Sequence, residues 1–360
     1  MICLNMIVKN EAADIGRCLN SVKDVVDYYL IADTGSTDGT PEIIKELLKG
    51  VEGEVLFHDW VNFGHNREKI LQCAYQNKNI DYCLIIDADE ELIGDKSAFK
   101  KLTADCYAIE RRQATISYHL PSLINIKRQE WHWKGVVHNY LSGLGSREIL
   151  EGVTILHHYG KGGKSSGLSQ REKFLRDAAL LEEEIRKNPS DTRSVFYLAQ
   201  SYRDAGEPQK AYENYIKRVE LGGWAEEVYY SMLQAGSCKE DISGNFPLED
   251  FLEAYNYRPT RVEAVHDIVR YFRSKKQYYL AYLFAKEGNK IPPSKDVLFV
   301  RRDMEEWRMK DELAISAYWI GKYKESEELC DELLRGKLPE REVERVKKNR
   351  DYARRELAKQ

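Results

Sequence analysis

The chain lacks paired cysteines, long apolar runs and a strong excess of charge of either sign. Its seven cysteines are widely scattered and none forms a CxxC pair, so they predict reduced core thiols rather than disulfides or zinc ligands. No apolar segment approaches about 18 residues, and we therefore expect no transmembrane helix. Residues 2–8 form a strand-like run without a basic leader, which predicts no signal peptide and a cytoplasmic location.

The sequence also lacks the features that attract nucleic acid or bind phosphate through glycines. A net charge of −4 and a pI near 6.1 give no general attraction to nucleic acid or anionic membranes. No GxGxxG follows the first predicted strand and no GxxxxGK[ST] occurs anywhere, which argues against a dinucleotide fold and a P-loop. The length of 360 residues is enough for two domains, each with its own core.

Strand-like and helix-like periods alternate over residues 1–90. The predicted strands cover residues 2–8, 28–32, 54–58 and 82–86, and the predicted helices between them cover residues 11–22, a segment beginning at Thr40, and residues 67–75. This alternation predicts βαβ units and a mostly parallel sheet covered on both faces. Ligands of such sheets bind beyond the carboxyl ends of the strands.

Two of the predicted strands end in carboxylates. The run Asp87-Ala88-Asp89-Glu90-Glu91 follows the fourth strand, and Asp33 ends the second, so these side chains should share one edge of the sheet. Strand alternation puts Asp87 and Asp89 on the same side. Carboxylates this close repel one another unless protons or a hard divalent cation intervene. The alternative is an acidic first turn of a helix, stabilised by the helix dipole.

Four ordered blocks carry a resemblance that favours the cation. Met6-Ile7-Val8-Lys9-Asn10-Glu11, Cys18-Leu19-Asn20-Ser21-Val22, residues 32–40 and Asp87-Ala88-Asp89-Glu90 resemble the family-2 glycosyltransferases of GT-A type. The subgroup that the chain looks like has a tetratricopeptide-like tail and includes peptide S-glycosyltransferases of bacteriocin pathways. The resemblance covers roughly the first 160 residues. It implies an inverting transferase that takes its sugar from UDP.

The resemblance also implies roles for the acids. Asp33 would accept a hydrogen bond from the uracil ring, and Asp89 would bind Mn²⁺ or Mg²⁺ between the two phosphates. Asp87 would contact the ribose or a metal-bound water, Ala88 would lie between these two acids in the site, and Glu11 would lie near the nucleoside. The alternative for Asp33 is a turn residue in a cluster rich in glycine, serine and threonine.

Two further segments resemble parts of the same family. The aromatic turn Trp60-Val61-Asn62-Phe63 precedes Arg67, which is a candidate pyrophosphate or carboxylate partner or, alternatively, a structural arginine at a helix start. The segment at residues 131–139 holds two tryptophans, two histidines and a lysine, which suit sugar stacking, although both tryptophans could instead pack in the core. The family often has glutamate where this chain has Asn139.

Inversion requires a base near the acceptor hydroxyl or thiol, and the sequence does not identify it. The candidates are His138 and Glu110, followed by Glu130 and Glu148. His158 aligns with a His-x-Gly of the family and would join Asp89 and Asp87 as a metal ligand, with a polar rim residue as the alternative. The basic, glycine-rich residues 161–167 predict a lid over the diphosphate or an interdomain linker.

From residue 170 onward the period is helical. Small and large apolar residues recur at tetratricopeptide spacing, with Val195, Leu198, Ala199 and Tyr202 in the first unit and weaker copies after residues 224, 265 and 313. Such helix pairs stack into a solenoid with a concave surface for an extended partner. We therefore expect an α/β GT-A domain at residues 1–165 and an all-α solenoid at residues 166–360.

The sequence thus predicts a metal-dependent glycosyltransferase acting from a UDP-sugar on a peptide, protein or glycan acceptor. The acceptor is expected to lie partly on the helical repeats, which could also pair two copies of the chain. Two alternatives are a non-catalytic scaffold with a relic nucleotide-sugar domain and a metal-dependent nucleotidyltransferase or nuclease. The intact acids Asp33, Asp87 and Asp89 argue against the scaffold.

Overall fold

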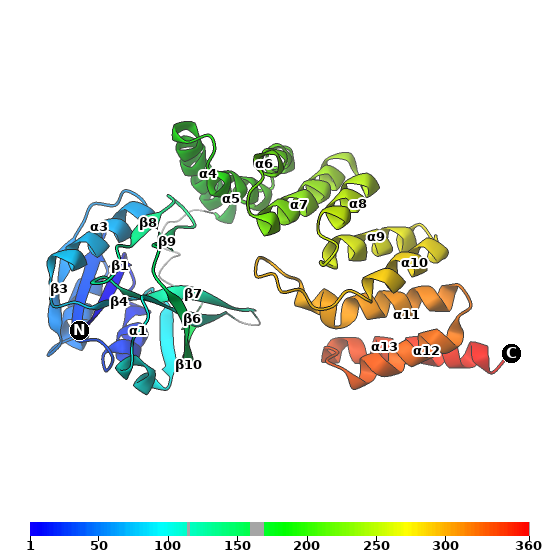
Figure 1. Ribbon diagram of the computed structural model, residues 1–360, viewed down its shortest axis with the longest axis horizontal. Helices are drawn as coiled ribbons and strands as arrows, with labels where there is room; N and C mark the ends of the chain where they lie inside the picture. Colours follow the sequence, from blue (N-terminus) through cyan, green and yellow to red (C-terminus); the bar gives the residue numbers. More distant parts are fainter. Residues whose placement is uncertain (114–115, 159–168, 360) are drawn as a thin grey trace. The chain divides into compact units, whose positions relative to one another are not determined.

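The computed structural model describes residues 1–113, 116–158 and 169–359, which divide into two compact units (Figure 1). Unit 1 is Met1–Lys173 and unit 2 is Phe174–Gln360. The boundary expected between residues 165 and 166, and the glycine-rich residues 161–167, lie outside the described residues. No helix in these described ranges is long and apolar enough to cross a membrane.

Unit 1 contains the predicted alternation of strands and helices. Its elements are β1 (Ile2–Val8), α1 (Ile15–Val22), β2 (Tyr28–Asp33), α2 (Thr40–Leu47), β3 (Glu52–Phe57), α3 (Phe63–Gln76), β4 (Tyr82–Ile85), β5 (Glu90–Gly94), η1 (Lys96–Lys100), β6 (Cys106–Gln113), β7 (Ile116–Asn125), β8 (His132–Lys134), β9 (Tyr140–Ser142) and β10 (Arg147–His157). Helix α3 begins at Phe63 rather than at residue 67, because the Asn62 side chain caps it by accepting from the His65 N–H at 2.8 Å. Helix α1 begins at Ile15 rather than at residue 11, after a turn in which the Glu11 carbonyl accepts from the Ile15 N–H.

The eight-stranded sheet has the order β3-β2-β1-β4-β7-β6-β10-β5, and a separate ladder joins β8 to β9. Strands β3, β2, β1 and β4 are parallel, so the carboxyl ends of β2 and β4 meet at one edge. Helices α1 and α2 bury one apolar cluster with the sheet, and α3 buries the other on the opposite face. The predicted α/β sheet covered on both faces is thus confirmed.

Strand β5 lies at the end of the strand order, although it follows β4 closely in the sequence. It pairs only with β10 in the described sheet, with His157 opposite Glu90. The Ser21 hydroxyl of α1 accepts from the Leu92 N–H at 3.0 Å, and Arg111 of β6 donates to the Ile85 carbonyl at 3.3 Å. These contacts join β5, α1, β6 and β4 around the carboxylates of residues 87–91.

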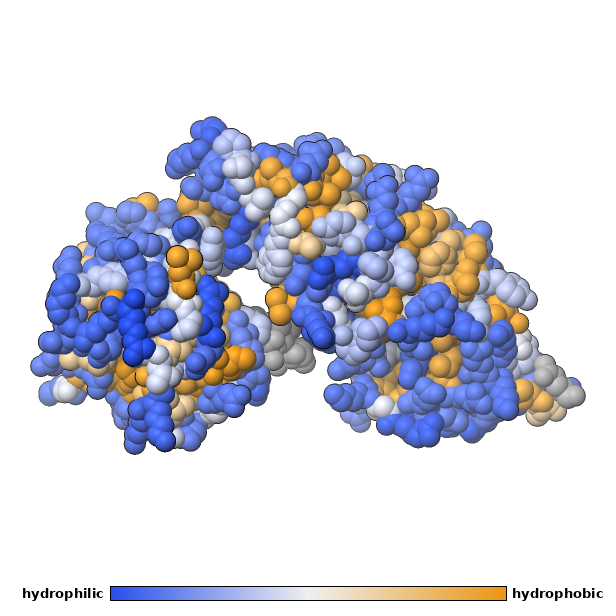
Figure 2. Space-filling view, viewed as in Figure 1, coloured by the Kyte–Doolittle hydropathy of each residue, from blue (hydrophilic) through white to orange (hydrophobic). Residues whose placement is uncertain are grey.

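Unit 2 is helical in its described part and confirms the predicted solenoid class (Figure 1). Its elements are α4 (Gln170–Lys187), which begins in unit 1, α5 (Thr192–Asp204), α6 (Pro208–Leu221), α7 (Ala225–Ser243), α8 (Leu248–Tyr257), α9 (Glu263–Ser274), α10 (Tyr278–Gly288), η3 (Met304–Arg308), α11 (Met309–Trp319), α12 (Tyr323–Arg335) and α13 (Glu340–Leu357). Consecutive helices from α5 to α10 pack on one another, as do α10 to α13. Figure 2 shows mainly hydrophilic side chains on the outside of these helices, with hydrophobic ones in separate patches.

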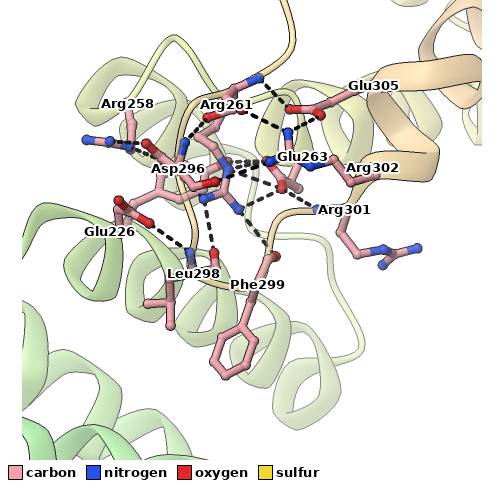
Figure 3. A network of polar contacts seen from close by, with 12 residues as sticks. Glu226, Arg258, Arg261, Glu263, Asp296, Leu298, Phe299, Arg301, Arg302 and Glu305 are labelled. Carbon is pink, nitrogen blue, oxygen red and sulfur yellow. Dashed lines mark hydrogen bonds and ion pairs between the residues drawn. The ribbon is translucent and has the colours of Figure 1, made fainter. Parts of the chain in front are cut away.

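A segment between α10 and η3, residues 294–302, is bound to the helices by buried ion pairs (Figure 3). Arg261 is fully buried, pairs with Glu263 at 2.7 Å and Asp296 at 3.2 Å, and donates to the Leu298 and Phe299 carbonyls. We call residues 294–302 the strap. A fully buried guanidinium with this many acceptors is satisfied only while the strap stays in place.

The cysteines agree with the prediction of reduced thiols. All seven are free, and each is buried except Cys73, which is half-buried. Burial raises the pKa of Cys106 to about 11 and of Cys330 to about 12. These thiols therefore stay protonated at neutral pH and act as small apolar core residues.

Candidate functional site

Asp33 ends β2 at the shared edge of the sheet. Its side chain is 1% exposed, and Oδ1 accepts from the Gly35 and Ser36 N–H groups, both at 2.9 Å. Gly35 has φ +103°, a conformation that favours glycine in this turn. The second oxygen, Oδ2, is buried and has no hydrogen-bond partner among the described residues. Asp33 is therefore both a turn residue and a buried acceptor that a ligand donor could satisfy.

Asp87 follows β4 and is held by Arg67 of α3. The Arg67 Nη2 lies 2.6 Å from the Asp87 Oδ1, and the Asp87 N–H donates to Oε2 of Glu90 at 2.8 Å. Burial opposes the charge on Asp87, but Arg67 and Arg111 outweigh it and hold its pKa below the usual range. Asp87 is thus an ionised carboxylate at neutral pH, with a guanidinium as its neighbour.

Glu90 and Arg111 form a buried ion pair beneath these acids, which sequence reasoning missed. Both side chains are almost fully buried, at 2% and 7% exposure, and the Arg111 Nη1 pairs with Oε1 of Glu90. Burial, together with repulsion from Asp87, raises the pKa of Glu90 in spite of Arg111. Nothing in the local sequence indicates that these two charged residues are buried. The ion pair between Glu90 of β5 and Arg111 of β6 forms only because of the strand order.

Asp89 lies beside the histidine pair that ends β10. The Nε2 of His157 is 3.7 Å from Oδ2 of Asp89, whereas the Nε2 of His158 is 2.8 Å from Oε2 of Glu91. The backbone explains this arrangement, since the His158 N–H donates to the Asp89 carbonyl at 3.1 Å and successive side chains alternate. The structure therefore brings His157 to Asp89 and places His158, the predicted metal ligand, against Glu91.

Glu11 belongs to the same group of acids. Burial is the largest cause that raises its pKa to about 7, followed by repulsion from Asp89. Its Oε2 is buried without a hydrogen-bond partner in the described part of the chain. Burial and the charge of Asp87 also raise the pKa of Asp89, against the attraction of His157. Burial is thus the main cause of both raised pKa values, and repulsion among the acids adds to it.

These acids do not form a ready-made metal cage. No group of three or more His, Cys, Asp or Glu side chains within the described residues is arranged to hold a metal ion. The donor set nevertheless fits a hard cation, because the Asp89 carboxylate lies beside an imidazole and Glu11 has a buried oxygen without a hydrogen-bond partner among the described residues. Mg²⁺ in particular is usually bound by one or two carboxylates together with substrate phosphates and water.

The first two candidate bases lie on β6 and in the turn between β8 and β9. Glu110 accepts from the Thr154 hydroxyl at 2.8 Å and from Arg112 at 2.9 Å, and it points to the sheet face opposite its neighbour Arg111. His138 is exposed and adopts a left-handed φ of +49° in the turn between β8 and β9. Ala88 is 5% exposed and packs in the core between Asp87 and Asp89.

The segment at residues 131–139 divides into core and site residues. Trp131 is fully buried, and its Nε1 donates to the Asn125 carbonyl at 3.1 Å, so the core interpretation holds for it. Trp133 instead lies under the Arg67 guanidinium, whose carbon is 4.9 Å from the ring centroid. Arg67 also donates to Oδ1 of Asn139 at 2.8 Å. This segment therefore contacts the same arginine as Asp87.

The first unit of the chain matches a known family model. Residues 3–166 match the family model described as Glycosyl transferase family 2. Unit 1 thus matches a glycosyltransferase family 2 domain over most of its length, and a tetratricopeptide-like helical unit follows it. The recognition made from the four sequence blocks is confirmed.

Several known proteins are similar to this chain over different lengths. A TPR repeat-containing protein of Synechococcus elongatus is 27% identical over 332 residues, which are 81% of this chain and 76% of that protein. The SPbeta prophage-derived glycosyltransferase SunS of Bacillus subtilis is 38% identical over 89 residues, 24% of this chain and 20% of SunS. An uncharacterised glycosyltransferase of Rickettsia felis is 38% identical over 87 residues, 24% of this chain and 28% of that protein. The chain thus spans less than a third of the length of the glycosyltransferases it matches.

Two solved structures are also similar. TarS 1–349 of S. aureus in complex with UDP-GlcNAc has a TM-score of 0.41 and 11% identity, covering 72% of this chain and 92% of that one. The structure of MamA has a TM-score of 0.34 and 16% identity, covering 55% of this chain and 94% of that one.

Proposed function

We propose that the protein transfers a sugar from a UDP-sugar to a peptide, protein or glycan acceptor, with inversion and with a divalent cation. The observation that carries this proposal is Oδ2 of Asp33, a buried acceptor without a partner in the described part of a family-2 domain. A buried carboxylate oxygen left unpaired is costly, and the single ring N–H of uracil would satisfy it. Oδ2 of Asp33 thus lacks a hydrogen-bond donor in the described part of the chain, and a uracil base would supply one.

The acids of residues 87–91 would serve the diphosphate. Asp89 and Asp87, with His158 or the nearer His157, would hold Mn²⁺ or Mg²⁺. When bound, such a cation stabilises the negative charge of the departing diphosphate. The protein side chains provide the rest of the arrangement, since Arg67 keeps Asp87 ionised and Glu90 orients its backbone. Besides burial, the charges of Asp89 and Asp87 raise the pKa of Glu11, which would lie near the nucleoside.

The acceptor hydroxyl or thiol needs a base on the side opposite the leaving group. His138 is the first candidate because it is exposed on the turn next to Asn139, which Arg67 contacts. Glu110 is the second, although Thr154 and Arg112 already occupy its Oε2. A His138→Ala variant that loses transfer while still binding UDP would support the first assignment.

The helical unit would hold part of the acceptor. It contains a pocket of about 490 Å³ lined by both signs of charge and by Trp307, including His266, Arg270 and Glu342. A chain truncated near residue 170 should therefore lose selectivity for its acceptor more than hydrolysis of the sugar nucleotide. Full transfer to the native acceptor by that truncated chain would contradict this role. Pairing of two copies through the repeats stays a prediction.

The donor site is tested by calorimetric titration with UDP and Mn²⁺, comparing the wild type with Asp33→Asn. The asparagine can still accept from Gly35 and Ser36 through its oxygen but presents a donor in place of Oδ2. We expect UDP affinity to fall about tenfold or more, with little change in the melting temperature. Asp38→Asn, in the same turn, is the control and should leave the affinity within about twofold. An unchanged affinity in Asp33→Asn would remove Asp33 from the site.

The cation is tested separately by turnover. Asp89→Ala should abolish hydrolysis or transfer of UDP-sugar while the protein remains folded. Undiminished turnover of the wild type in EDTA would reject the cation. Thermal-shift ranking of UDP, UDP-sugars, nucleoside triphosphates and oligonucleotides with Mn²⁺ would expose a nucleotidyltransferase or nuclease instead.

A further inference from the structure

We propose that Arg67 is a positioning residue that couples the nucleotide edge at Asp87 to the segment at residues 131–139, so that donor binding orders the acceptor side. The proposal rests on the proposed function, because it takes Asp87 to lie in the donor site and His138 to face the acceptor. It assigns Arg67 a role beyond contact with a diphosphate. The role follows from three contacts that one side chain makes at once.

The Arg67 guanidinium spans the two sides of the site. Its Nη2 lies 2.6 Å from Oδ1 of Asp87, and its Nη1 donates to Oδ1 of Asn139 at 2.8 Å. Its flat face covers the Trp133 ring, 4.9 Å from the centroid. The Arg67 side chain is 19% exposed and that of Asp87 is 42% exposed, so solvent screens their ion pair in part. A planar fork with fixed donors therefore joins a carboxylate that follows β4 to an amide in the turn between β8 and β9.

Other residues at the start of helix α3 also contact residues 131–139. Oε1 of Glu68 lies 2.9 Å from Nδ1 of His132, and Oε2 accepts from the Trp133 N–H at 2.7 Å. At the start of the helix, a Cβ on Gly64 would meet the Gly135 carbonyl oxygen at 2.2 Å, so glycine is required for this close approach. The beginning of α3 thus holds the segment through backbone contact, Glu68 and Arg67, of which only Arg67 also touches Asp87.

The coupling follows from the geometry of arginine. If Asp87 moves or loses its charge, the guanidinium loses the partner that fixes its plane, and the bond to Asn139 and the stacking on Trp133 weaken with it. Coupling between two binding events is reciprocal, so a looser bond to Asn139 must weaken binding at Asp87 by the same factor. Lysine keeps the charge but cannot make two directed bonds and a flat stack, which makes Arg67→Lys the informative substitution.

The test is amide hydrogen exchange of the full chain, followed in peptides covering residues 131–141, with and without UDP and Mn²⁺. Without nucleotide, Asp87→Asn and Arg67→Lys should each speed exchange in this segment about fivefold, the effect of one lost hydrogen bond. With UDP and Mn²⁺, exchange in the wild-type segment should slow, and Arg67→Lys should abolish this response.

A matched pair of variants separates coupling from loosening. Asn139→Ala and Glu68→Gln should both speed exchange of residues 131–141, because each weakens a hydrogen bond between α3 and this segment. Only Asn139→Ala acts through Arg67, so it alone should weaken UDP binding measured by calorimetry, by about threefold to tenfold, with Glu68→Gln staying within about twofold.

Two results would overturn the proposal. One is an unchanged rate of amide exchange in residues 131–141 of Asp87→Asn without nucleotide. The other is unchanged UDP affinity in Asn139→Ala. A wild-type protein that does not bind UDP would instead refute the proposed function. The nucleotide-free comparison of Asp87→Asn with the wild type would still decide whether Arg67 couples the two sides.

Discussion

The Nε2 of His157 lies 3.7 Å from Oδ2 of Asp89, while the next residue, His158, contacts Glu91 through its Nε2 at 2.8 Å. The family resemblance instead favours His158 as the metal ligand beside Asp89. The antiparallel pairing of β10 with β5 gives the two histidines different carboxylates, because adjacent side chains leave a strand in opposite directions.

We therefore predict that the two histidines differ in their effect on cation dependence. His157→Ala should raise the Mn²⁺ concentration for half-maximal turnover of UDP-sugar by about tenfold, as expected for an imidazole beside a ligating carboxylate. His158→Ala should change it by less than about threefold, because its partner is Glu91. A larger loss in His158→Ala would show that the histidines rearrange on binding and that His158, as the family resemblance implies, is the metal ligand.

The raised pKa of Glu11 predicts a pH dependence of stability. With a pKa of about 7 when folded and about 4.5 when unfolded, the folded state keeps a proton between these values that the unfolded state has released. The resulting stability is fully present below pH 4.5 and is lost as the pH rises through 7. Glu11→Gln has no carboxylate that ionises, so its stability relative to the wild type should increase with pH.

The measurement is the melting temperature of both proteins from pH 5 to pH 8 without added metal. The two should melt together at pH 5, and Glu11→Gln should melt about 2–4 °C higher at pH 8, for a half-buried carboxylate contributing roughly 1 kcal/mol. Comparing the two proteins cancels other titrating groups such as His58, whose pKa burial lowers. A constant difference across this range would contradict the raised pKa.

The buried pair Glu90–Arg111 should be costly to break from one side. Arg111→Met leaves Glu90 buried without its cation, and we expect the free energy of unfolding of unit 1 to fall by about 3–5 kcal/mol. Glu90→Gln combined with Arg111→Met removes both charges and should recover part of this loss. Urea denaturation followed by circular dichroism would measure both, and equal stability of the single and double variants would refute the ion-pair account.

The strap offers the corresponding prediction in unit 2. Arg261→Met removes the guanidinium that holds Asp296 and the carbonyls of Leu298 and Phe299, so protease cleavage within residues 294–302 should accelerate at least about tenfold. Arg301→Ala is the control, because this arginine is half exposed and its side chain pairs with Asp303. Equal cleavage of the two variants would show that the buried network does not fix the strap.

The fold was largely predictable because its signals are local. Alternating periods predicted the parallel sheet, and carboxylates at the ends of β2 and β4 indicated the edge proposed as the functional site. Arg67 was a candidate carboxylate partner, and the structure supplies Asp87 as that partner. His157 and the pair Glu90–Arg111 were missed because their positions depend on the pairing of β10 with β5 and β6, which no local pattern encodes.

Helix boundaries show the same limit at a smaller scale. The sequence predicts the start of α3 four residues too late. Asn62, which caps the helix, lies among aromatic residues, and the helical spacing of apolar residues begins only after it. The start of α1 was placed early because the acid and alanines before Ile15 are good helix formers, yet they form a turn that brings Glu11 toward Asp89.

Strand β5 is made early and paired late. It leaves the ribosome directly after β4, but the ladder that receives it belongs to β10, more than fifty residues downstream. During synthesis, Asp89 therefore lacks its contacts with the His157 side chain and the His158 N–H until β10 has emerged. A nascent chain shorter than this cannot assemble the edge where the cation would sit, which ties the onset of activity to completion of the whole first unit.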